Sequence, residues 1–145
     1  MGARLFGAAV LRREDERLLR GRGRYVDDLA LPGMGHVAMH RSPHAHARII
    51  SVDTAKASDM PGVVGVLVPA DVAALPRLPL LVPHASLTAA VCPELLPREV
   101  VSYVGQAVAL VVAASRAEAE DALASLTVEY EPLPAVVTPK DALRE

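Results

Sequence analysis

Between Val101 and Pro134 the hydrophobic and polar positions follow a pattern that predicts strand, turn, strand, helix and strand, in that order. The run from Val108 to Ala114 is apolar at every position, which is typical of a strand covered on both faces. From Leu126 to Glu131 the apolar residues recur at every second position, which predicts a half-buried strand. We therefore take residues 101–134 as the core of the fold.

The helix expected between these two strands begins at Ser115. Glu118 follows three residues later, and this spacing is that of a capping box, in which the two side chains satisfy otherwise unpaired backbone N–H groups. The residues on the apolar face of the helix are Ala119, Ala122, Leu123 and Leu126. A face made mostly of alanine lets the helix lie close to a sheet. If both flanking strands share that sheet, their connection is a right-handed crossover.

The first half of the chain predicts a similar arrangement. Strands are expected at His36–Arg41 and Ala47–Asp53, paired as a hairpin or a bent long-strand pair, followed by a short helix from Thr54 and a buried strand at Val63–Val68. A further short helix is expected from Pro69 to Leu75. Strand, helix and strand thus occur twice, which predicts an α/β (α+β) fold with two β-α-β units in one mixed sheet.

Two stretches lack a sustained period. Residues 1–33 read as an extended N-terminal arm with one helical turn around Glu14–Leu19, ahead of a folded domain at 34–145. Residues 76–98 form a long Pro-rich loop, which is too apolar for a solvated linker and is expected to be covered by a neighbouring surface. From Ala135 a short connection leads to a last helical turn.

Composition limits the classes of function. Cys92 is the single cysteine, so the chain cannot form an internal disulfide or a multi-cysteine metal site, and a reducing compartment fits. Only 3% of the residues are aromatic, which leaves few platforms for stacking nucleic-acid bases. The apolar runs are shorter than the roughly 20 residues that cross a bilayer. No secretion signal is recognised in the sequence. We expect a soluble, cytoplasmic protein.

Charge is distributed unevenly along the chain. Residues 1–24 carry seven arginines against Glu14, Asp15 and Glu16, a balance of +4, which leaves −6 for the remainder of a chain with net charge −2. The alternation of glycine and arginine from Arg20 to Arg24 resembles RNA-binding tails. An arm that lies on a partner surface is the favoured alternative.

Three histidines, His40, His44 and His46, lie within seven residues, a density that also occurs in zinc and copper sites. No carboxylate or thiol stands at a ligand spacing, and a structured turn is favoured. Ser42 with His44 lacks the Gly-flanked turn and the third residue of a nucleophile site.

Other polar residues have simpler roles. Asp27 and Asp28 are adjacent, so they are expected to cap a loop and not to form an acid/base pair. Gly105 and Gln106 lie between two strands, where glycine relieves a turn and the glutamine either satisfies that turn or faces a ligand. These residues do not assemble an active site.

Several fragments together resemble one family. They are LLRGRGRYVDDLALPGMGH (18–36), HRSPHAHARIISVDTAKASDMPGVVGVL (40–67) and YVGQAVALVVAASRAEAEDALASLTVEYEPLPAVVTPKDAL (103–143). They are similar to the N-terminal α/β-hammerhead domain of the molybdopterin-binding large subunit of the xanthine dehydrogenase and aldehyde oxidase family, above all its carbon monoxide dehydrogenase-like members. The resemblance implies oxidation or hydroxylation at molybdenum in the complete enzyme. It also implies [2Fe-2S] clusters and FAD on companion subunits.

The same resemblance implies that the pterin contacts and the catalytic glutamate lie beyond Glu145. No catalytic, cofactor-binding or metal-binding residue is therefore assigned to this chain, which is expected to be inactive alone. Contacts with the molybdopterin-binding domains and the iron–sulfur and FAD subunits are expected at Arg41, Ser42, His44, His46, Arg48, Gly105 and Gln106. The alternatives are a free-standing protein-binding module with the same fold, and a homo-oligomer of the isolated chain.

Overall fold

The computed structural model describes residues 7–79, 82 and 94–143, and its chain divides into two compact units, Met1–Met34 and Gly35–Glu145. The first unit contains α1 (Asp15–Leu19), at the place where one helical turn is expected, and a 3-10 helix, η1 (Val26–Asp28). Asp28 accepts a hydrogen bond of 2.8 Å from the backbone N–H of Tyr25, which confirms a loop-capping role for this carboxylate.

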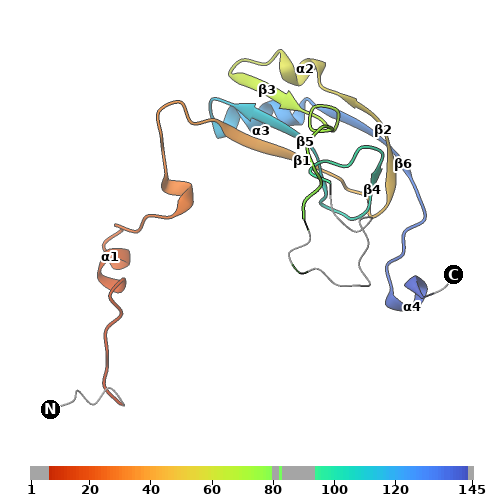
Figure 1. The fold of residues 1–145 in the computed structure, drawn as a ribbon. Helices are drawn as coiled ribbons and strands as arrows, with labels where there is room; N and C mark the ends of the chain where they lie inside the picture. Colours follow the sequence, from red (N-terminus) through yellow and green to blue (C-terminus); the bar gives the residue numbers. More distant parts are fainter. Residues whose placement is uncertain (1–6, 80–81, 83–93, 144–145) are drawn as a thin grey trace. The chain divides into compact units, whose positions relative to one another are not determined.

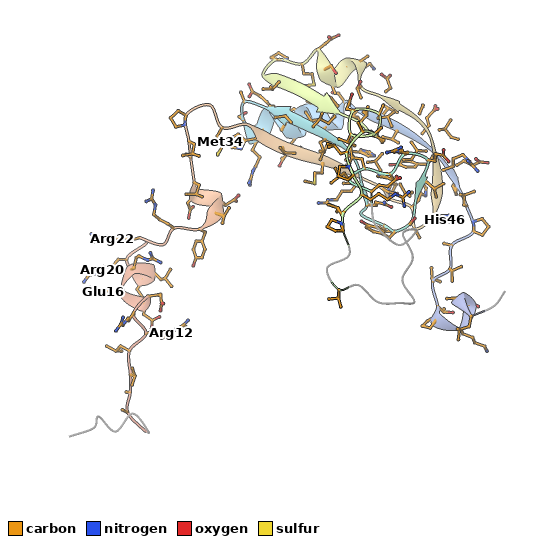
Figure 2. The ribbon with its side chains drawn as sticks, viewed as in Figure 1. Arg12, Glu16, Arg20, Arg22, Met34 and His46 are labelled. Atoms are coloured by element: carbon orange, nitrogen blue, oxygen red, sulfur yellow. The ribbon has the colours of Figure 1, made fainter. Side chains whose placement is uncertain are left out.

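Charged side chains gather around α1, where Figure 2 labels Arg12, Glu16, Arg20 and Arg22. Arg20 lies 3.0 Å from Glu16, and Arg12 lies 3.8 Å from Asp15, so two of the arginines form ion pairs within the arm. Because these pairs are exposed, each contributes little to stability.

The second unit contains two three-stranded sheets (Figure 1). The first sheet has the order β1-β5-β3, with bounds His36–Arg41, Ala107–Ala113 and Val63–Leu67. The second sheet has the order β4-β2-β6, with bounds Val100–Val101, Ala47–Asp53 and Thr127–Pro132. Every pair of neighbouring strands is antiparallel. The apolar strand β5 is central in its sheet, as predicted.

The expected strand pairing is wrong in two respects. β1 and β2 do not form a hairpin, because residues 42–46 carry the chain from the first sheet to the second. The single mixed sheet is also replaced by two antiparallel sheets. Strand, helix and strand do occur twice, as β2-α2-β3 with α2 at Ala55–Ser58 and as β5-α3-β6 with α3 at Arg116–Ala124, but each unit joins both sheets. A periodic pattern identifies a strand without identifying its neighbour.

Helix α3 covers one face of the first sheet (Figure 1). Its Ala119 and Ala122 are buried against Val111 and Ala113 of β5, so the alanine face predicted for the helix is confirmed. The Ser115 hydroxyl accepts from the Glu118 N–H at 3.3 Å and donates to the Glu118 carboxylate at 2.8 Å. The serine half of the predicted capping box is therefore confirmed, whereas the Glu118 carboxylate accepts from the Ser115 hydroxyl in place of a backbone N–H.

Two local expectations fail at the edge of the first sheet. β3 was expected to be buried, but it is an edge strand, and Val64 in its bulge is 74% exposed. Residues 69–75 form consecutive turns in place of a helix, and the Asp71 carboxylate accepts from the Val68 N–H at 2.8 Å. Proline at 69 and 76 leaves too few residues for a stable helix.

Much of the Pro-rich loop, including Leu80, Leu81, Leu87 and Val91, lies outside the described residues. In the part that is described, Leu96 is buried. The last helical turn is present as α4 (Pro139–Ala142), capped by Thr138. None of the described helices has the length and apolar character needed to cross a membrane.

Candidate functional site

Two turns that are distant in sequence lie together at the ends of β1 and β4. They are residues 41–46 and 102–106, here called the paired turns. The Ser42 N–H donates to the Gln106 carbonyl at 2.8 Å, and the Gly105 N–H donates to the Ser42 carbonyl at 2.8 Å. The structure thus joins Arg41, Ser42, Gly105 and Gln106, which sequence analysis selected as two separate contacts.

Side chains reinforce the paired turns. The Arg41 guanidinium donates to the Gly105 carbonyl at 2.9 Å, and the Gln106 side-chain oxygen accepts from the Ser102 N–H at 2.7 Å. Gly105 has φ +90°, a conformation that residues with a Cβ adopt only with strain. Gln106 therefore satisfies the turn, which is one of the two roles left open by the sequence.

Ser42 holds the first of the paired turns through its buried hydroxyl. It is only 2% exposed, and its hydroxyl accepts from the His44 N–H and donates to the His44 carbonyl, both at 3.0 Å. These contacts form a serine turn with the backbone of His44. The arrangement gives no support to a nucleophile and base pair.

The three histidines have different environments. The ring of His40 stacks on Tyr130 with centroids 6.4 Å apart, whereas His44 meets Tyr130 edge-on at 5.1 Å. His46, labelled in Figure 2, places Nδ1 2.6 Å from the Pro134 carbonyl, which can only accept, so Nδ1 carries the proton. No three His, Cys, Asp or Glu side chains in the described ranges gather as a metal-binding group.

Burial shifts the pKa values of both residues in the His40–Tyr130 stack. It lowers the pKa of His40 and raises the pKa of Tyr130, the latter opposed by the nearby Ser42 hydroxyl. The Tyr130 hydroxyl and His40 Nε2 are buried without a well-formed hydrogen bond. We regard Tyr130 as a packing residue that supports the first turn from the second sheet.

The remaining predicted residue, Arg48, lies on the second sheet and not in the paired turns. Its guanidinium is 3.3 Å from the Glu131 carboxylate, and both side chains are about half exposed. Two exposed residues beside Gly105 were not among the predicted contacts: Tyr103, 57% exposed, and Val104, 63% exposed. Their only signal was an apolar pair in a predicted turn, where polar residues are usual.

Comparison with known proteins shows one family to which this chain is similar. Residues 20–134 match the model of the aldehyde oxidase and xanthine dehydrogenase a/b hammerhead domain. The large subunit of nicotine 6-hydroxylase from Paenarthrobacter nicotinovorans is 42% identical over 97% of this chain. The large chain of carbon monoxide dehydrogenase from Afipia carboxidovorans is 45% identical over 94% of it. The chain spans only 17% and 16% of the lengths of these two relatives.

Solved structures agree in fold. Quinoline 2-oxidoreductase from Pseudomonas putida 86 has a TM-score of 0.82 and 52% identity over 94% of this chain and 17% of its own. The Cu,Mo-containing carbon monoxide dehydrogenase has a TM-score of 0.83 and 43% identity, with the same coverage of both chains. The α/β-hammerhead fold is thereby confirmed.

Proposed function

The chain belongs to the aldehyde oxidase and xanthine dehydrogenase family, of which it is the a/b hammerhead domain, and we propose that it is a structural domain used to assemble a molybdenum hydroxylase large subunit. In this proposal the paired turns contact the rest of that subunit, and the chain alone does not catalyse a reaction. Iron–sulfur and FAD subunits complete the enzyme.

One observation carries the proposal. Hydrogen bonds between the two turns engage Arg41, Ser42, Gly105 and Gln106, while Tyr103 and Val104 are turned toward solvent. A rigid turn with exposed aromatic and aliphatic side chains is suited to packing on another surface.

The family implies molybdopterin in the complete enzyme, where the cofactor supplies the molybdenum at which substrate is oxidised. We propose that the remainder of the large subunit holds that cofactor. In the paired turns the backbone N–H groups of Ser42 and Gly105 and the guanidinium of Arg41 already donate to carbonyls of the facing turn. We assign no step of the molybdenum reaction to these residues.

Co-expression tests the proposal. A tagged form of this chain is produced together with the polypeptide that corresponds to the remainder of a large subunit, and we expect the two to purify as an equimolar complex. Replacing Tyr103 and Val104 by serine should weaken that complex by about tenfold or more, because two apolar contacts are lost.

Val136→Ser is the matched control, since Val136 is 66% exposed but lies outside the paired turns. This variant should bind as the parent chain does. Absence of any complex would contradict the assembly role. A complex that is indifferent to the double substitution would instead show that the paired turns are not the contact.

A further inference from the structure

The first sheet has an outer face opposite α3. The register aligns Val37 with Val112, and it aligns Met39 and Leu67 with Leu110, so these five apolar side chains point to one side. We call this set the outer face. The side chains of Val37, Met39 and Leu67 are 54%, 44% and 38% exposed. Leu110 and Val112 of β5 are partly exposed.

The outer face is unusual for its strands. The apolar run of β5 is typical of a strand covered on both sides. Helix α3 covers the side of Val111 and Ala113 (Figure 1), whereas Leu110 and Val112 on the other side stay partly exposed in the described part of the chain. β1, β5 and β3 contain a single permanently charged residue, Arg41, at the end of β1. Soluble sheets ordinarily carry polar residues on a face that meets water.

The outer face is continuous with the paired turns. The Arg41 guanidinium that donates to the Gly105 carbonyl also lies 3.4 Å from the sulfur of Met39. Arg41 therefore stands at the boundary of both surfaces. A partner that packs on the paired turns would extend directly over the outer face.

We propose that the outer face is covered by the remainder of the same large-subunit polypeptide, as a core-type interface inside one folded subunit. This inference rests on the proposed function. More than four fifths of each curated relative lies outside the region matched by this chain, so ample polypeptide is present to cover it. The absence of charged residues within the outer face favours a permanent contact, because transient interfaces between subunits are more polar.

Thiol labelling of the assembled subunit tests this inference. In a Cys92→Ser background, a cysteine is introduced on the outer face by Met39→Cys or Leu67→Cys, and the rate of maleimide labelling is measured with and without the remainder of the subunit. We expect assembly to slow labelling at both positions by about tenfold or more, because a covered thiol is inaccessible.

Glu120→Cys, on the exposed side of α3, is the control and should label at the same rate in both states. Unchanged labelling at positions 39 and 67 in a subunit that does assemble would overturn the inference and leave the proposed function intact. Protection that already appears in a dimer of the isolated chain would also overturn it, in favour of a second copy. Failure to assemble would overturn both proposals. Thermal unfolding of each variant verifies its fold.

Discussion

The backbone N–H of Gly105 donates to the carbonyl of Ser42 at 2.8 Å, and this bond joins the segment that follows β1 to the segment that leads into β5. Arg41 closes the same junction by donating to the Gly105 carbonyl at 2.9 Å. The conformation of the paired turns therefore depends on the positive φ of Gly105, which few other residues adopt.

Gly105→Ala should destabilise the chain by about 1–2 kcal/mol, because φ +90° is strained for a residue with a Cβ although space is open around it. Urea unfolding measures the change. Gly65→Ala is the matched control: an added Cβ meets nothing within 4 Å and φ is not positive, so no loss is expected. Equal midpoints for parent and Gly105→Ala would refute the strain at the turn.

Gly62→Ala should be at least as costly, at about 1–3 kcal/mol. Gly62 has φ +78°, and a Cβ there would overlap the Glu118 carboxylate that bonds Ser115 at the start of α3. Combining it with Glu118→Ala should remove the overlap but retain the backbone strain. The double variant should then be more stable than the two single losses predict when added. Strict additivity would mean that the Glu118 side chain moves away without cost.

Ser115→Ala should reduce the free energy of unfolding by about 1 kcal/mol, because the Glu118 N–H loses its acceptor at the N-terminus of α3. Ser115→Asn keeps a capping oxygen and should retain most of the stability. Thermal unfolding compares the three proteins. A loss that is equal for alanine and asparagine would point to packing at this position in place of capping.

Stability should fall in mildly acidic solution. Burial lowers the pKa of His40 from its ordinary value of 6.5, so below that pH the unfolded chain binds more protons than the folded chain. The free energy of unfolding therefore decreases as the pH falls from 6.5 toward the lowered pKa. His40→Phe keeps a ring beside Tyr130 and should flatten this dependence, measured by urea unfolding between about pH 7 and pH 5.

Met39→Leu serves as the control, since it changes a neighbouring side chain of β1 without removing an ionisable group, and it should keep the parent's pH dependence. An unaltered slope in His40→Phe would place the acid sensitivity elsewhere in the molecule.

Local structure was accessible from the sequence wherever a single segment carried the information. The apolar run of β5, the cap at Ser115 and the alanine face of α3 are properties of consecutive residues, and all three are confirmed. Strand partners depend on contacts between distant segments. The five residues between β1 and β2 resemble a hairpin loop in length, yet they carry the chain into a different sheet.

In the candidate site, too, the sequence indicates single residues, whereas contacts between distant segments decide how they are arranged. Arg41, Ser42, Gly105 and Gln106 were selected one by one, but only the fold brings them together as paired turns. Tyr130 was missed because an alternating strand pattern gives its side chain no special role, whereas the second sheet places its ring against His40 and His44. Exposure of Tyr103 and Val104 likewise depends on how the turn is held.

The central claim is that this chain contributes structure to a molybdenum hydroxylase subunit whose metal is held elsewhere. Elemental analysis of the complex between this chain and the remainder of a large subunit, before and after its two components are separated, tests that claim most directly. The account predicts that molybdenum stays with the remainder and that this chain carries none. Molybdenum that stays with this chain after separation would contradict the account.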